Sequence, residues 1–162
     1  MRRFRPLADS ESTHTMTTDR PRIVNLSPAD PARPQPGRAN GAEADRAENA
    51  VLTAYLAHLT AKGHHVLRHR VVTYPALAST DLFDRTAGEV VMASHRSDYH
   101  ALISAHGVLS DCAQHFPSAR RALLLTAEPG PAAREFLSHH QIIAIWPEGE
   151  SFVRAHPAAR GS

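Results

Sequence analysis

Residues 80–98, TDLFDRTAGEVVMASHRSD, have the pattern of a β-hairpin. A short apolar run flanked by Asp81 and Asp84 precedes the turn RTAG, and the valine-rich segment GEVVMAS follows it. Two such runs separated by a glycine-containing turn are typical of strands joined by a short loop. Because side chains alternate along a strand, we expect Met92 and Ser94 on one face and Glu89 on the other.

Helices and strands are predicted on both sides of this hairpin. Residues 42–63 carry apolar side chains at three- and four-residue spacing, which indicates a helix that ends at Gly63. Residues 65–72, HVLRHRVV, alternate as a strand does. Residues 98–116 are predicted to be a second helix, with Ser97 as its cap.

The C-terminal part of the chain adds buried strands and a third helix. RRALLLT (residues 120–126) and QIIAIW (residues 141–146) are apolar runs, as in parallel strands buried on both faces. Between them, residues 130–140 begin with a proline at a first-turn position and predict a short helix, and residues 151–153 predict an edge strand. The order α-β-β-β-α-β-α-β predicts an α/β fold with a mixed central sheet and helices on both faces.

The first 42 residues differ in composition from the rest. They hold seven arginines and four acidic residues, whereas residues 43–162 hold eleven Lys or Arg and twelve acidic residues. Prolines and glycines gather at the end of this first segment, and it shows no helical or strand period. We therefore predict a disordered Arg/Pro-rich arm (1–42), a folded domain (43–155) and a C-terminal tail (156–162). The arm is either an electrostatic tether to nucleic acid or a solvated tail.

Cysteine and histidine usage argues against several classes of site. Cys112 is the single cysteine, so an internal disulfide or a cysteine-based zinc site is excluded, and a reducing cytoplasm is expected. The twelve histidines form no HExxH motif, and glycine-rich phosphate loops and a G-x-S-x-G elbow are absent from the sequence. No apolar run approaches the roughly 18 residues that a membrane span needs, so we expect no membrane association.

The ordered series of segments resembles the PD-(D/E)xK nuclease superfamily, which has the restriction endonuclease-like fold, and within it an actinobacterial group. The matching segments are RAENAVLTAYLAHLTAKGHHVLRHRVV, TDLFD, the GE turn with the helix after it, PSARRALLL and QIIAIWPEGESF. The resemblance covers about residues 43–153, most of the chain that we expect to be ordered. It implies a core of the order α-β-β-β-α-β.

The resemblance also implies where a metal site would lie. In that family an aspartate and an E-x-K on the next strand hold Mg²⁺, which activates a water molecule at the scissile phosphate. The aspartate falls on Asp81, and the E-x-K falls on Met92-Ala93-Ser94, so the glutamate and the lysine are both replaced. Because a thioether is a poor ligand for Mg²⁺ and serine supplies no cation, Asp81 remains as a weak metal ligand at most.

Neighbouring side chains are candidate substitutes for the missing groups. Glu89 could serve only if a bulge turned it to the other face, whereas His95 and Arg96 follow directly at the strand end. Arg68, Arg70 and Arg96 are candidate contacts to the phosphates of a nucleic acid.

Three functions remain open from the sequence. The first is a catalytically degenerate nuclease-like domain that binds DNA or a protein partner and needs no cofactor. The second is an active Mg²⁺-dependent DNA endonuclease with a migrated site that uses Asp81, Glu89 and His95 or Arg96. The third is a folded relic without a biochemical role.

Overall fold

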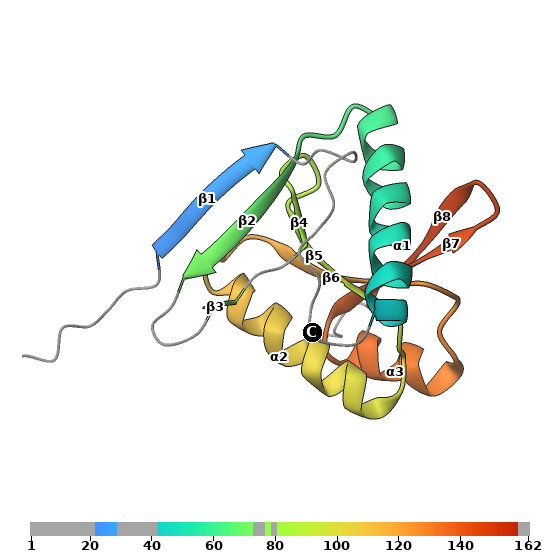
Figure 1. The fold of residues 1–162 in the computed structure, drawn as a ribbon. Helices are drawn as coiled ribbons and strands as arrows, with labels where there is room; N and C mark the ends of the chain where they lie inside the picture. Colours follow the sequence, from blue (N-terminus) through green and yellow to red (C-terminus); the bar gives the residue numbers. More distant parts are fainter. Residues whose placement is uncertain (1–21, 29–41, 73–76, 79–80, 159–162) are drawn as a thin grey trace, which may run out of the picture.

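The computed structural model describes residues 22–28, 42–72, 77–78 and 81–158. Its centre is one mixed sheet with the strand order β1-β2-β4-β5-β6-β7-β8, and the short β3 pairs with β2 (Figure 1). The strands are β1 Arg22–Pro28, β2 Val66–Val72, β3 Leu77–Ala78, β4 Leu82–Asp84, β5 Glu89–Ser94, β6 Arg120–Leu125, β7 Ile142–Glu148 and β8 Ser151–Ala155. Strands β5, β6 and β7 are parallel and the other pairs are antiparallel. The predicted α/β class with a mixed sheet is confirmed.

Helices cover both faces of this sheet. α1 (Ala42–Ala61) lies on one face, and α2 (Tyr99–Ala113) and α3 (Pro131–His139) lie on the other (Figure 1). Alternate residues of the central strands point to the two sides. Val91, Ala93, Ala122 and Leu124 pack toward α1, whereas Val90, Met92, Leu123 and Leu125 pack toward α2 and α3. The near-continuous apolar runs of β5, β6 and β7 follow from burial on both faces.

The hairpin forms where its sequence predicts it. β4 and β5 pair in the register Leu82↔Val91, Phe83↔Val90 and Asp84↔Glu89. Gly88 takes a φ of 65° in the turn, a conformation that costs glycine little because it has no Cβ. This register places Asp84 and Glu89 directly opposite each other on the face that α1 covers.

The second predicted helix forms with a different cap. Asp98, not Ser97, caps α2, and its carboxylate accepts a hydrogen bond from the backbone N–H of Ala101 at 3.3 Å. A carboxylate placed one residue later than expected reaches the free N–H groups of the first turn equally well. The helix ends at Ala113, before Phe116, whose ring stacks on that of Phe83 at a centroid distance of 4.6 Å.

The prediction that residues 1–42 lack regular structure is wrong for residues 22–28. These residues form β1, which pairs antiparallel with β2. The β-branched Ile23 and Val24 favour a strand, and pairing satisfies backbone groups that β2 would otherwise leave at an open edge. Residues 1–21 and 29–41 of the predicted arm and residues 159–162 of the predicted tail lie outside the described residues.

We expect the two sides of α2 to respond differently to truncation. Leu109 is fully buried, and Leu109→Ala should lower the free energy of unfolding by about 2–5 kcal/mol because it leaves a cavity. Ile103, on the same helix, is 44% exposed, and Ile103→Ala should cost about 1 kcal/mol or less. Urea unfolding of both variants measures the difference, and equal costs would contradict the placement of α2.

Candidate functional site

Asp81 lies at the entrance to β4, beside β5. Its backbone N–H donates to the carbonyl of Val91 at 3.1 Å, and its Oδ2 accepts the backbone N–H of Ala93 at 2.6 Å. Extending the hairpin register by one residue places Asp81 opposite Met92. The carboxylate therefore holds the two strands together at the open end of the hairpin.

Met92 and Ser94 are built into the interior. Met92 is 9% exposed and belongs to the apolar cluster beneath α2 and α3. Ser94 is 8% exposed; its hydroxyl donates to the carbonyl of Arg96 at 2.8 Å and lies 3.2 Å from the backbone nitrogen of the same residue. Neither position offers a charged group, and both side chains already have protein partners.

His95 and Arg96, the candidate substitutes after β5, are both engaged. Glu48 of α1 places its Oε1 3.0 Å from the backbone N–H of His95 and 2.8 Å from the ring Nδ1. Arg96 donates to Asp98 at 2.6 Å, and this hydrogen bond lowers the pKa of the Asp98 carboxyl. Sequence reasoning did not single out Glu48, because its approach to His95 depends on how α1 lies across the sheet.

Glu89 lies at the other end of β5 and on the other face. It lies six positions before His95, or roughly 20 Å away along an extended strand. It is fully buried, and Arg154 of β8 donates Nη2 to both carboxylate oxygens at 2.6 Å. Arg120 of β6 contributes a second guanidinium 2.8 Å from Oε1. The structure thus brings Asp81, Met92, Ser94 and the His95 backbone to one end of the hairpin and leaves Glu89 at the other.

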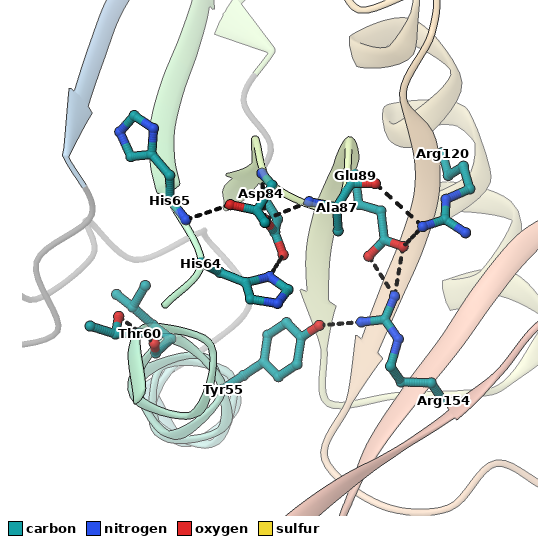
Figure 2. A network of polar contacts seen from close by, with 11 residues as sticks. Tyr55, Thr60, His64, His65, Asp84, Ala87, Glu89, Arg120 and Arg154 are labelled. Carbon is teal, nitrogen blue, oxygen red and sulfur yellow. Dashed lines mark hydrogen bonds and ion pairs between the residues drawn. The ribbon is translucent and has the colours of Figure 1, made fainter. Parts of the chain in front are cut away.

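Asp84 faces Glu89 and is also fully buried (Figure 2). Its Oδ2 lies 2.6 Å from Nδ1 of His64. Its Oδ1 accepts the backbone N–H groups of Thr86 and Ala87, both at 3.0 Å, within the turn of the hairpin. Each buried oxygen therefore has a partner, as the cost of burying an unsatisfied carboxylate requires.

Tyr55 of α1 is a hydrogen-bond partner of Arg154. Nη1 of Arg154 donates to the tyrosine hydroxyl at 2.6 Å (Figure 2). Burial, aided by the charges of Glu89 and Asp84, raises the pKa of Tyr55 to about 12, although Arg154 opposes the shift. Burial is the largest single influence on Arg154 and would lower its pKa, but the hydrogen bonds to Glu89 and the charges of Tyr55, Glu89 and Asp84 together outweigh it and raise the pKa.

Six side chains make up what we call the buried polar network: Tyr55, His64, Asp84, Glu89, Arg120 and Arg154. Two carboxylates directly opposite on neighbouring strands repel each other, and the network offsets this with cations and donors from four other segments. Alternation along β5 predicts that Glu89 turns toward α1, but nothing local to it identifies Arg154, which lies 65 residues further along the chain. The geometry is that of a structural ion-pair cluster.

The remaining candidate phosphate contacts, Arg68 and Arg70, both belong to β2. Arg68 is half-buried on β2, and the side chain of Arg70 lies outside the described residues. Among the side chains that the structure describes, no three His, Cys, Asp or Glu residues converge closely enough to hold a metal ion. Within the same ranges, no helix combines the length and the apolar character needed to cross a bilayer.

Comparison with protein-family models, curated proteins and solved structures finds no match for this chain.

Removing one charge from the buried polar network should be far more costly than removing one from the surface. Glu89→Gln leaves two guanidinium groups facing a neutral amide, and we expect it to lower the free energy of unfolding by about 3–5 kcal/mol. Glu128 pairs with Arg134 at 3.1 Å but is 59% exposed, so Glu128→Gln should cost about 1 kcal/mol or less. Denaturant unfolding of the two variants tests this, and similar costs would show that the network contributes no special stability.

Alkaline titration should separate the tyrosines. The pKa of Tyr55 is about 12 in the folded protein, whereas a tyrosine in an unfolded chain has a pKa near 10. The contribution of this difference to the free energy of unfolding is fully present below pH 10 and is lost as the pH rises toward 12. Absorbance at 295 nm should show a late transition that Tyr55→Phe removes. Tyr99→Phe, at a position 66% exposed, should leave that transition in place. If the late transition persisted in Tyr55→Phe, its assignment to Tyr55 would be wrong.

Proposed function

We propose that residues 43–155 form a restriction endonuclease-like domain that has lost phosphodiester cleavage and acts as a binding module. Apart from the two-residue β3, the order α1-β2-β4-β5-α2-β6 supports this, with β2, β4 and β5 antiparallel and β6 parallel to β5. The placement of α1 and α2 on opposite faces supports it as well. These are the features that the resemblance in sequence leads one to expect.

The main support for this proposal is the identity and the contacts of the side chains at positions 81, 92 and 94. In a cleaving domain of this type, a carboxylate at position 92 would stand opposite Asp81, with a cation two residues further on the same face. Here the buried thioether of Met92 stands opposite Asp81. The Oδ2 of Asp81 accepts a hydrogen bond from the backbone N–H of Ala93, and the Ser94 hydroxyl donates one to the backbone carbonyl of Arg96. A hard cation such as Mg²⁺ needs several oxygen ligands, and this end of the hairpin supplies few.

The candidate substitutes do not rebuild the missing set. Glu89 is on the opposite face and is bound by two arginines. Glu48 is a further carboxylate at this end, and it favours the alternative of an active Mg²⁺-dependent nuclease, because it could turn from His95 to a metal. With two carboxylates and no lysine, we expect this alternative to give at most slow cleavage.

Charge bears on the kind of partner. Residues 43–162 hold eleven Lys or Arg against twelve acidic residues, which is unlike a domain built to grip a phosphate backbone. Arg96 and Arg154 each pair with a carboxylate of the domain itself. These pairs favour a protein partner for the folded domain, and the arginines of residues 1–42 are the better candidates for contact with DNA.

Cleavage assays test the loss of activity. The natural protein should leave plasmid and single-stranded DNA intact with Mg²⁺ or Mn²⁺, because it lacks the E-x-K groups. Met92→Glu/Ser94→Lys should produce detectable nicking, and adding Asp81→Ala should abolish it. Asp111→Ala removes an exposed carboxylate from α2 and serves as the matched control.

Cleavage by the natural protein that Asp81→Ala or Glu48→Gln abolishes would contradict the proposal and establish the active alternative. Because a glutamate at a buried position costs stability, circular dichroism should accompany the double variant. The comparison of the natural protein with Asp81→Ala remains decisive even if the double variant fails to fold.

A further inference from the structure

A cavity of about 370 Å³ opens at the end of the sheet where β6 and β7 begin. Its lining includes Arg120, Arg121, Gln141, Ile143 and His156. The volume is at the lower end of the range typical of small-molecule sites, roughly 300–1,000 Å³. Three segments that are distant in sequence meet here, because β7 pairs with both β6 and β8.

The walls of the cavity are held in place by hydrogen bonds. Gln141 takes a φ of 57°, the only positive φ among the described non-glycine residues. Its backbone N–H donates to Ser138 at 3.1 Å, and its side-chain amide donates to the carbonyls of Ser138 at 3.0 Å and Ala158 at 3.4 Å. A residue kept in this sparsely populated conformation is more frequent at functional sites than elsewhere.

Arg120 is a pre-positioned cation at this cavity. Its backbone N–H donates to Gly88 at 2.8 Å, and its Nη2 contacts the carbonyl of Ala87 at 3.3 Å and Oε1 of Glu89 at 2.8 Å. The side chain remains 55% exposed, and within the described ranges its Nε and Nη1 have no protein partner. A guanidinium that is already ordered, with donors to spare, loses little entropy when it binds a ligand.

The charges around the cavity are unbalanced in favour of an anion. Glu89 is fully buried, and both its oxygens already accept from Arg154, so it neutralises Arg120 only in part. Arg121 adds a positive charge from the opposite face, although it is engaged by Ser110 and by the carbonyl of His140. His156 is exposed, and no carboxylate is among the described residues that line the cavity.

We propose that this cavity binds a phosphate group, with Arg120 as the principal donor and His156 as the second. The planar fork of a guanidinium matches phosphate oxygens, and a second nitrogen donor beside it favours a compact anion over an extended chain. The phosphate is either free in solution or the terminal group of a nucleic acid. This inference requires neither metal binding nor the nuclease-like ancestry of the domain.

Titration of the full chain with inorganic phosphate, followed by ¹H–¹⁵N NMR at constant ionic strength, tests the site. We expect saturable shifts at the amides of residues 119–121, 141 and 156, with half-saturation on the order of 1 mM. His156→Glu places an anion at an exposed position and should weaken binding by about tenfold or more while the rest of the spectrum is preserved. Arg120→Gln should remove saturable binding.

Two variants control for the change in charge alone. Arg85→Gln removes an exposed arginine from the hairpin turn, and His100→Glu introduces an acid on α2; both should bind phosphate as the natural protein does. Shifts that do not saturate, that chloride reproduces at equal ionic strength, or that persist in His156→Glu would overturn the proposal. The His156→Glu result stands even if Arg120→Gln, which also disturbs Glu89, is unstable.

Oligonucleotides with a 5′-phosphate or a 5′-hydroxyl distinguish the two sources of phosphate. The site is assigned to nucleic-acid ends if the 5′-phosphorylated strand binds more tightly than inorganic phosphate and the 5′-hydroxyl strand causes no chemical-shift change at these amides. Binding of inorganic phosphate alone assigns it to a free anion. Absence of binding by all three probes would show that the cavity is not a phosphate site.

Discussion

Two carboxylates that face each other across a hairpin impose the main constraint on this fold. Asp84 and Glu89 are opposite in register and fully buried, so their charges repel in an interior of low dielectric constant. The pair is tolerable only because other segments supply compensating groups. His64 reaches Asp84, and Arg120 and Arg154 reach Glu89. The end of α1, the middle of the sheet and the last strand are thereby tied to one turn.

The other end of the same hairpin has the opposite character. Asp81 accepts a hydrogen bond from the backbone of β5, and Met92 packs in the apolar core. The Ser94 hydroxyl donates to the backbone carbonyl of Arg96, two residues further along the chain. An active metal site keeps charged groups unsatisfied until metal and substrate bind, whereas these groups satisfy one another. The two ends of β5 therefore differ in their polar chemistry: one end holds an ion-pair cluster on the α1 face, and the other holds a carboxylate, a buried thioether and a hydroxyl that have partners within the protein.

Arg120 connects the constraint to the proposed phosphate site. Glu89 holds this guanidinium at one nitrogen, and the residue lines a cavity at the beginning of β6 and β7. A surface arginine would lose side-chain entropy on binding an anion, whereas Arg120 has already lost it on folding. A network that stabilises the hairpin thus also orders a binding group, even though the hairpin itself lacks the groups needed for cleavage.

The sequence by itself determined the local features: the hairpin, the alternation that separates Glu89 from Met92, the parallel strands and the helices around them. These follow from periods of two and 3.6 residues, which need no knowledge of the partner segments. Only the tertiary structure decided that Arg154 pairs with Glu89, that Glu48 meets His95, and that residues 22–28 add a strand. Such pairings depend on strand order and on how each helix lies across the sheet. Burial of the apolar surface of the whole domain favours that arrangement, so these pairings depend on residues that are distant from the paired groups in the sequence.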